Sequence, residues 1–265
     1  MFVSSALSSQ VENSSAGRPV IQSSTAEDLL FFFDEEELII ATRNTVPVKK
    51  APAIATVVTE KEIRNMGALN LMDVLKTVPG IGVSITEYGD TMFEVRGIRT
   101  QMSEKILLMI DGHPMNGNFS GSALRHLFND LTVENIKRVE IVRGPGSALY
   151  GANAFVAVIN VVMKEAADTN GLQLKGGYGS SDTRHLSATG GKVFGDDVRI
   201  SGSIDYFRSD GAKIRIEEDI LSGTPFSTAP GNAFIGVEKT DLFLRTSLGD
   251  LTFRGHYLKK DLKND

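Results

Sequence analysis

The segment that decides the fold is Arg138-Val-Glu-Ile-Val-Arg-Gly-Pro-Gly-Ser-Ala-Leu-Tyr-Gly151, followed by Ala152-Asn-Ala-Phe-Val-Ala-Val-Ile-Asn-Val-Val-Met163. It predicts a β-strand, a turn built on glycine and proline, a short helical turn that ends at Gly151, and a second apolar strand. The segment contains no Cys or His, and Ser147 has no base beside it in the sequence. Because it specifies a backbone shape and no chemistry, it favours a protein that holds, moves or binds over an enzyme.

The composition is that of a globular protein. The chain has 265 residues, 41% hydrophobic and 23% charged, so one large domain or two ordinary ones can form. A net charge of −5 gives no electrostatic basis for binding nucleic acid. The lack of cysteine excludes disulfides, thiolate zinc sites and cysteine nucleophiles, and it suits the periplasm and the cytosol alike. No stretch approaches the ~20 apolar residues of a membrane helix.

The chain divides into four predicted parts. Residues 1–36 are interpreted as a disordered leader, because they are mostly polar and rich in serine and their start lacks the basic and apolar regions of an export signal. Residues 37–52 form a short extended segment and a linker, whose prolines disfavour a helix. A compact domain over 53–165 follows, and then a series of β-strands over 171–265.

In the compact domain short helices are interspersed with strands. Thr59 and Glu62 form a capping-box pattern, and the helix that they start should end at Gly67. A second helix is predicted over 70–78, where apolar residues recur on one face. Strands are predicted over 54–58, 92–97, 105–111, 138–143 and 156–163, with helical turns at 124–131 and 132–137. The prediction is an α+β domain with a small mixed sheet.

After Asn170-Gly171 apolar and polar residues alternate along segments of about 10 residues. In 198–206 the even positions are Val, Ile, Gly, Ile and Tyr, and the odd positions are Arg, Ser, Ser and Asp. Such alternation fits a transmembrane β-barrel and also a β-sandwich with one solvated face, and aromatic residues near the strand ends favour the barrel. The other segments are 172–178, 184–192, 241–248 and 251–258, with short turns at 195–197 and 249–250 and a long polar insertion, 209–236, expected on the opposite side.

Four motifs, in this order, resemble the plug domain of TonB-dependent outer-membrane receptors. They are Asp73-Val-Leu-Lys-Thr-Val-Pro-Gly-Ile81, Phe93-Glu-Val-Arg-Gly-Ile98, Leu107-Leu-Met-Ile-Asp-Gly-His-Pro-Met-Asn116 and the block from Arg138 to Met163. The resemblance covers about residues 37–265, the last part by pattern more than by motif. It implies an α+β plug domain followed by antiparallel transmembrane β-barrel strands of an incomplete barrel, in the outer membrane of a Gram-negative bacterium.

The resemblance also implies a function. Such receptors import a scarce nutrient, for example a ferric siderophore, haem or cobalamin, and the plug is an energy-coupled gate with no cofactor. The inner-membrane protein TonB pairs with an extended N-terminal segment, the TonB box, by strand addition, and pulls the plug open. By position we predict this box at Glu37, Leu38, Ile39, Ile40, Ala41 and Thr42. The alternative is a linker strand packed on the plug.

Arg96 and Arg143 each precede a glycine at the end of a predicted strand. The resemblance implies that they face glutamates of the barrel wall and latch the plug, and a planar guanidinium suits bidentate pairing with a carboxylate. The alternative is an ordinary ion pair within the plug, for example with Glu94 or Glu140.

Substrate contacts follow only by analogy with the apical loops of family plugs. These loops would present Thr100, Gln101, Met102, Ser103, Asn116, Asn118 and Phe119. His113 stands where the family usually has Val, and a solvated turn histidine is favoured over a haem or metal ligand. No metal site is predicted, and the substrate is not named by the sequence.

Two other classes of protein remain open. One is a soluble periplasmic binding or interaction protein with an α/β head and a β-sandwich tail, and the other is an adhesin or structural surface protein, against which the plug motifs argue. Gly144-Pro-Gly-Ser-Ala lacks the lysine of a phosphate-binding loop, so an enzyme is not expected. Because about five strands cannot close a barrel around a plug, we expect the N-terminal part of a receptor of about 600 residues or more.

Overall fold

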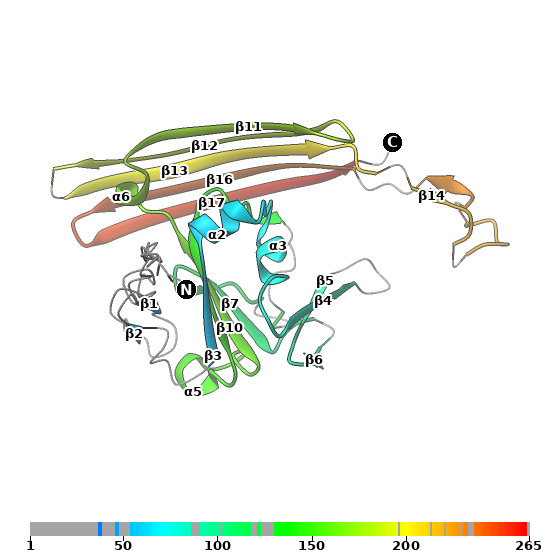
Figure 1. Ribbon diagram of the computed structural model, residues 1–265, viewed down its shortest axis with the longest axis horizontal. Coiled ribbons are helices and arrows are strands. Elements are labelled where there is room, and N and C mark those ends of the chain that lie inside the picture. Colours follow the sequence, from blue (N-terminus) through cyan, green and yellow to red (C-terminus); the bar gives the residue numbers. More distant parts are fainter. Residues whose placement is uncertain are drawn as a thin grey trace, which may run out of the picture. The chain divides into compact units, whose positions relative to one another are not determined.

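The computed structural model describes residues 37–38, 46–47, 54–85, 91–100, 102–117, 121–122, 130–195, 197–212, 214–219, 221–227, 229–232 and 236–263. Glu37–Asp265 belong to one compact unit. The predicted leader, residues 1–36, lies outside the described residues. Figure 1 shows the plug region with its short helices and small sheets, and a second region built of long strands.

A mixed five-stranded sheet forms the centre of the plug, in the order β3-β9-β10-β7-β8. β10 lies in the middle, antiparallel to β9 and parallel to β7. Its almost unbroken apolar run suits a strand buried on both faces. The strands are β3 (Ile54–Thr59), β7 (Ile106–Ile110), β8 (His113–Pro114), β9 (Ile136–Arg143) and β10 (Ala157–Met163).

The helices of the plug begin at side-chain caps. Before α2 (Glu60–Asn65) the Thr59 hydroxyl accepts a hydrogen bond from the Glu62 N–H, and the Glu62 carboxylate accepts one from the Thr59 N–H at 2.8 Å, so the predicted capping box is confirmed. Asn70 caps α3 (Leu71–Leu75) through its side-chain oxygen. Two further short helices among the described residues are α5 (Ser147–Tyr150) and α6 (Ala166–Thr169), and a second, three-stranded sheet comprises β4 (Ile81–Ile85), β5 (Thr91–Val95) and β6 (Ile98–Arg99).

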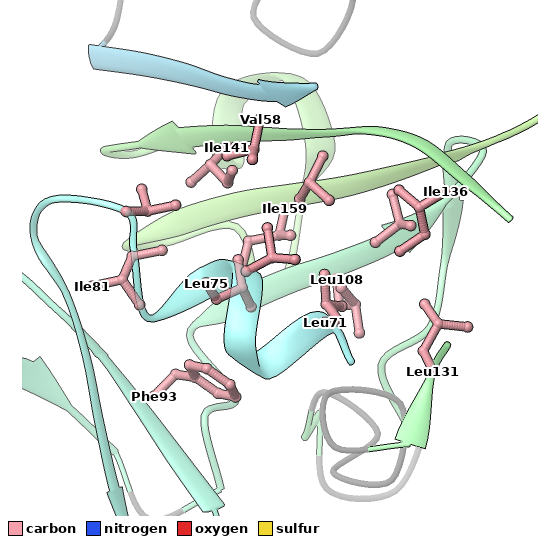
Figure 2. Packing of buried hydrophobic residues seen from close by; sticks show 14 of the residues in the cluster. Val58, Leu71, Leu75, Ile81, Phe93, Leu108, Leu131, Ile136, Ile141 and Ile159 are labelled. Carbon is pink, nitrogen blue, oxygen red and sulfur yellow. The ribbon is translucent and has the colours of Figure 1, made fainter. Parts of the chain in front are cut away.

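The plug core lies between α3 and the central sheet (Figure 2). Leu71 and Leu75 of α3 are completely buried, and they belong to one cluster with residues of β7, β9 and β10, among them Leu108, Ile141 and Ile159. Burial of each such side chain stabilises the fold by roughly 1.5–3 kcal/mol. The predicted apolar face of the second helix is therefore the face that holds the helix on the sheet.

A five-stranded antiparallel sheet, here called the wall sheet, comprises β11, β12, β13, β16 and β17 in this order. The short turn at 195–197 lies beside the turn after β16, since the Gly249 N–H donates to the Asp197 carbonyl at 2.9 Å. The long connection after β13 starts at the other end, where the Asp210 N–H donates to the Ser181 carbonyl, as expected. The strands are β11 (Gly171–Gly179), β12 (Thr183–Phe194), β13 (Val198–Ser209), β16 (Gly236–Leu248) and β17 (Leu251–Lys263), and the connection carries β14 (Arg215–Ile216) and β15 (Gly231–Asn232).

The wall sheet buries the polar side chains of its middle strands, β12, β13 and β16, and exposes its apolar face. Leu174 and Phe253 are 71% and 66% exposed, whereas Asp205 and Asp241 are 1% and 2% exposed. A β-sandwich would bury the apolar face instead. The alternative of an α/β head with a β-sandwich tail is therefore wrong, and the alternation marks strands whose apolar side chains face a non-aqueous surrounding.

In the part of the chain that the structure describes, no helix has the length and apolar character required to cross a membrane.

Most predicted strands are confirmed within a few residues of their ends. The stretch 132–137 is only partly the predicted helical turn: the Ile136 N–H closes one turn on the Val133 carbonyl, and Ile136 already starts β9. Both side chains are buried in the core, and this three-residue spacing imitates a helix. The turn predicted at 124–131 lies outside the described residues except for its last two.

Replacing Leu75 by Ala should lower the free energy of unfolding of the plug by about 2–5 kcal/mol, because the truncation leaves a cavity beneath α3. Denaturant titration followed by circular dichroism measures the effect. The matched control is Leu69→Ala, since Leu69 is 44% exposed and the same truncation there should change the stability by at most about 0.5 kcal/mol. Equal losses in both variants would contradict the described core.

Candidate functional site

The structure brings Arg96 and Arg143 together around Gly80, just after α3. A Cβ atom placed on Gly80 would lie 3.6 Å from Arg143 Nη1 and 3.9 Å from Arg96 Cγ. Arg143 ends β9, and Arg96 stands in the turn after β5 with a φ of 53°, a conformation that costs a side-chain-bearing residue about 1–2 kcal/mol. We call these two residues the arginine pair.

Arg143 is incompletely satisfied. Its guanidinium donates to the Pro79 carbonyl and, at 2.6 Å, to the Thr56 hydroxyl, but its Nε–H has no hydrogen-bond partner among the described residues. Burial lowers the pKa of the Arg143 guanidinium, and the charge of Arg96 lowers it further. Glu140, the alternative partner within the plug, pairs with Arg138 instead, at 2.7 Å.

A polar network crosses the central sheet from Glu140 to the turn after β7. Glu140 is fully buried, and its second oxygen lies 3.2 Å from the Asn160 amide nitrogen. The Asn160 oxygen in turn accepts the Gly112 N–H at 2.9 Å. Because buried polar groups need partners, this chain of bonds fixes the turn after β7 to the middle of the sheet.

Asp111, in that turn, connects the plug to the wall sheet. One carboxylate oxygen accepts the Met163 N–H at 2.9 Å, and the other lies 3.4 Å from Arg245 Nη1 and 3.6 Å from Arg254 Nε. Arg245 also pairs with Glu165 at 2.8 Å. The sequence indicates only turn chemistry for Asp111; its φ of 47° confirms the turn, but its side chain also binds the wall.

A second contact between the plug and the wall sheet lies further along β16 and β17. Asp130 is 2.9 Å from Lys260 Nζ, and the Asp130 carbonyl accepts from Lys239 at 3.4 Å. Nearby, the Asp241 carboxylate accepts the Thr132 N–H at 3.4 Å. Glu134 also pairs with Lys175 of β11.

These ion pairs have the opposite polarity to the predicted latch of Arg96 and Arg143, which involves other residues. In the described residues the plug supplies carboxylates and the wall sheet supplies the cations of the ion pairs between them. Sequence reasoning missed these residues. A signal was present, because the inward-facing positions of the two last strands carry cations at Lys239, Arg245, Arg254 and Lys260.

A cavity of about 560 Å³ lies between the plug and the wall sheet at Asp111. It is lined by apolar residues, among them Leu107 and Met109, and by charged residues, among them Arg138 and Arg254. His113 is exposed beside it, and its Nε2 lies 2.8 Å from Arg254 Nη1. The described residues contain no group of three or more His, Cys, Asp or Glu placed to hold a metal ion.

The predicted apical-loop residues differ in accessibility. Met102 is exposed, whereas Ser103 is buried and its hydroxyl accepts the Phe93 N–H at 3.1 Å. The Asn116 amide is used within the plug, bonded to the backbone of Ile106 and Leu108. Thr100 follows β6 and is half-buried. Gln101, Asn118 and Phe119 lie outside the described residues.

The predicted TonB box is described only at its start. Glu37 and Leu38 form β1 and pair in antiparallel fashion with β2 (Val46–Pro47). Residues 39–42, which are Ile39, Ile40, Ala41 and Thr42, lie outside the described residues.

A plug-like α+β domain whose carboxylates meet the polar face of an inside-out sheet defines the class of outer-membrane receptors gated by an internal plug. Residues 47–158 match the family described as TonB-dependent Receptor Plug Domain. The chain therefore carries a TonB-dependent receptor plug domain, followed by antiparallel strands.

Curated relatives and solved structures agree with this assignment. The vitamin B12 transporter BtuB of Vibrio vulnificus strain CMCP6 is 32% identical over 173 residues, which are 63% of this chain and 27% of that protein. The BtuB of strain YJ016 is 27% identical over 216 residues, or 80% of this chain and 33% of that protein. The chain therefore spans a third or less of these relatives.

Two solved receptors share the fold at low sequence identity. The ferripyoverdine receptor of the Pseudomonas aeruginosa outer membrane has a TM-score of 0.63 at 20% identity, over 85% of this chain and 27% of that one. The siderophore receptor PiuA of Acinetobacter baumannii has a TM-score of 0.60 at 21% identity, over 83% and 28%.

Substitutions in the arginine pair should have opposite effects on stability. Arg96→Asn removes a like charge and suits the positive φ, so it should stabilise the plug by about 1 kcal/mol. Arg143→Gln loses charge-assisted hydrogen bonds and should destabilise it by about 1.5–3 kcal/mol. Denaturant titration compares them with Arg99→Asn, an exposed arginine of β6, which should be neutral within about 0.5 kcal/mol. A loss in Arg96→Asn as large as that in Arg143→Gln would contradict this.

Proposed function

We propose that the protein acts as a TonB-dependent receptor that imports a scarce nutrient across the outer membrane, with the plug as an energy-coupled gate and no catalytic role. The observation that carries this proposal is the plug domain packed on the polar face of an inside-out sheet. The substrate class is a bulky metal chelate or corrinoid: a ferric siderophore, haem or cobalamin.

The wall sheet supports a position in the lipid bilayer. Its exposed face carries large apolar side chains, such as Leu172, Leu244 and Phe253, which suit contact with outer-membrane lipid. In outer-membrane barrels the short turns lie on the periplasmic side and the long loops outside. By that rule the turns at 195–197 and 249–250 are periplasmic, and the connection over 210–235 is exposed at the cell surface.

The arginine pair supports the predicted latch. Arg143 has a free Nε–H among the described residues, and Arg96 holds a second positive charge beside it in a strained backbone conformation. Two crowded cations, one of which has an unused donor, would be stabilised by carboxylates of another wall segment. Loss of those carboxylates would release this side of the plug, as a gate requires.

Residues 37–42 remain the proposed TonB box, and TonB is the proposed partner. The antiparallel pairing of Glu37 and Leu38 with β2 supports this proposal, because strand addition needs the extended backbone that these two residues have. TonB would either use the free edge of this pairing or replace Val46–Pro47.

The proposed substrate contacts are the predicted apical-loop positions, with Thr100 and Met102 the more accessible among those described. Two similar proteins are named as vitamin B12 transporters, and two similar structures as siderophore receptors. Receptors distinguish such substrates by specific polar contacts, so a direct uptake measurement is needed to identify the substrate of this protein.

Uptake should depend on both the protein and TonB. Cells that lack their own cobalamin and ferric-siderophore receptors should take up radiolabelled cobalamin, or one of a panel of ferric siderophores and haem, when they express the complete receptor to which this chain belongs. The uptake should fall to background in a strain without TonB. Uptake of none of these compounds, or equal uptake without TonB, would contradict the proposed function.

Ile39→Pro should abolish binding of the chain to the C-terminal domain of TonB, because proline lacks the N–H that strand addition uses. A pull-down with the immobilised TonB domain measures this. The matched control is Ile21→Pro in the leader, which should bind as the parent chain does. Binding that is unchanged by Ile39→Pro would rule out residues 37–42 as the box.

A further inference from the structure

Two of the acidic contacts between plug and wall sheet are made by almost fully buried aspartates and are separate from the arginine pair. Asp111 pairs with Arg245 and Arg254, and Asp130 pairs with Lys260. The aspartate side chains are only 7% and 4% exposed, so salt screens these pairs less than surface pairs. We call Asp111 and Asp130 the acidic anchors.

The two acidic anchors contact the wall sheet at different positions along its strands. On β16 Arg245 contacts the Asp111 carboxylate, and Lys239 contacts the main-chain carbonyl of Asp130. These two wall residues are six apart, which corresponds to about 20 Å along an antiparallel strand. A single contact could serve as a pivot, whereas two contacts at this separation also fix the orientation of the plug.

Close packing also joins the plug to the wall sheet, at Phe243 between the anchors and at α6. Phe243, which lies between these positions on β16, is 7% exposed and is the one wall residue in the described core cluster of the plug. On β12, a Cβ atom at Gly191 would lie 2.8 Å from the Ala166 carbonyl oxygen, so α6 packs directly on the strand backbone. Neither of these two contacts involves charged groups. The cations of the anchors do stand opposite each other, Arg245 beside Arg254 and Lys239 beside Lys260, but an aspartate of the plug contacts both members of each pair.

The arginine pair is the opposite case, with crowded like charges and a free donor. The described partners of Arg143, Thr56 and Pro79, belong to the plug. The acidic anchors and the arginine pair therefore differ in the sign of their charge and in whether all their hydrogen-bonding groups have partners. They also differ in whether those partners belong to the wall sheet or to the plug.

We propose that the wall sheet is the stationary side of the gate: Asp111 and Asp130 are positioning residues that hold the plug on β16 and β17 while the arginine pair is released. The inference rests on the proposed function, and it places the passage for the substrate on the side of the plug away from the wall sheet. The acidic anchors then determine which part of the plug stays in place.

The test measures one distance in the full chain in detergent micelles. The chain contains no cysteine, so Lys61→Cys and Asp250→Cys give two unique spin-label sites, both exposed, one on α2 and one in the turn between β16 and β17. Double electron–electron resonance should give a single narrow distance distribution in this parent. The double variant Asp111→Asn with Asp130→Asn should broaden it and reduce the fraction in the parent peak at least twofold.

Asp182→Asn is the matched control. Asp182 also has a positive φ, 49°, and also pairs with an arginine, Arg184, but within its own hairpin. The distribution should stay as in the parent. The exchange of charges in Asp130→Lys with Lys260→Asp should restore the peak relative to Asp130→Lys alone, which separates loss of the pair from loss of folding.

A parent-like distribution in the Asp111→Asn, Asp130→Asn variant would overturn the proposal, and so would a swap that restores nothing. Hydrogen exchange of the β9 and β10 amides reports whether the plug itself remains folded in each variant. The readout uses neither TonB nor substrate, so failed uptake would count against the proposed function alone. Arg143→Gln should leave the distance between α2 and the turn unchanged, and a broadening as large as in the anchor variant would also overturn the proposal.

Discussion

The burial of the polar face of the wall sheet is the constraint on which the rest of the structure depends. A sheet that shows Leu, Phe and Tyr outward leaves its Asp, Lys, Arg and His side chains facing inward, where each needs a partner. The plug supplies these partners with Asp111, Asp130 and the Thr132 N–H. The plug is therefore a second layer that completes the sheet, and its position follows from the charges that the wall presents.

The same requirement accounts for the unusual features of the plug surface. Asp111 has a positive φ, a conformation that favours glycine. An aspartate stands there because its carboxylate bonds both the Met163 N–H and the wall arginines. Arg96 has the same backbone strain but lies beside another cation. At Asp111 an ion pair offsets the backbone strain, so the contact is stable. At Arg96 the backbone strain and the like charge both favour separation of the arginine pair. The two regions therefore suit a fixed side and a releasable side.

Much of the fold could be predicted from the sequence because it depends on local chemistry. Thr59 and Glu62 define a helix start, and strict alternation after Gly171 defines the strands of the wall sheet. Alternation alone does not decide between barrel and sandwich, because both put polar and apolar residues on opposite faces. Burial makes the decision, since Asp205 and Asp241 are inside and Leu174 is outside.

The site was harder to predict because its partners are far apart in sequence. Asp111 and Arg245 are separated by 134 positions, and Asp130 and Lys260 by 130. When only the neighbouring residues in the sequence are considered, a role in a turn or at a helix end already explains each aspartate. Sequence analysis selects Arg96 and Arg143 instead, because each precedes a glycine in a recognisable motif. An inward position on a barrel strand can face water, so the inward cations of β16 and β17 require acids from the plug only where the plug buries them, as it does Lys239.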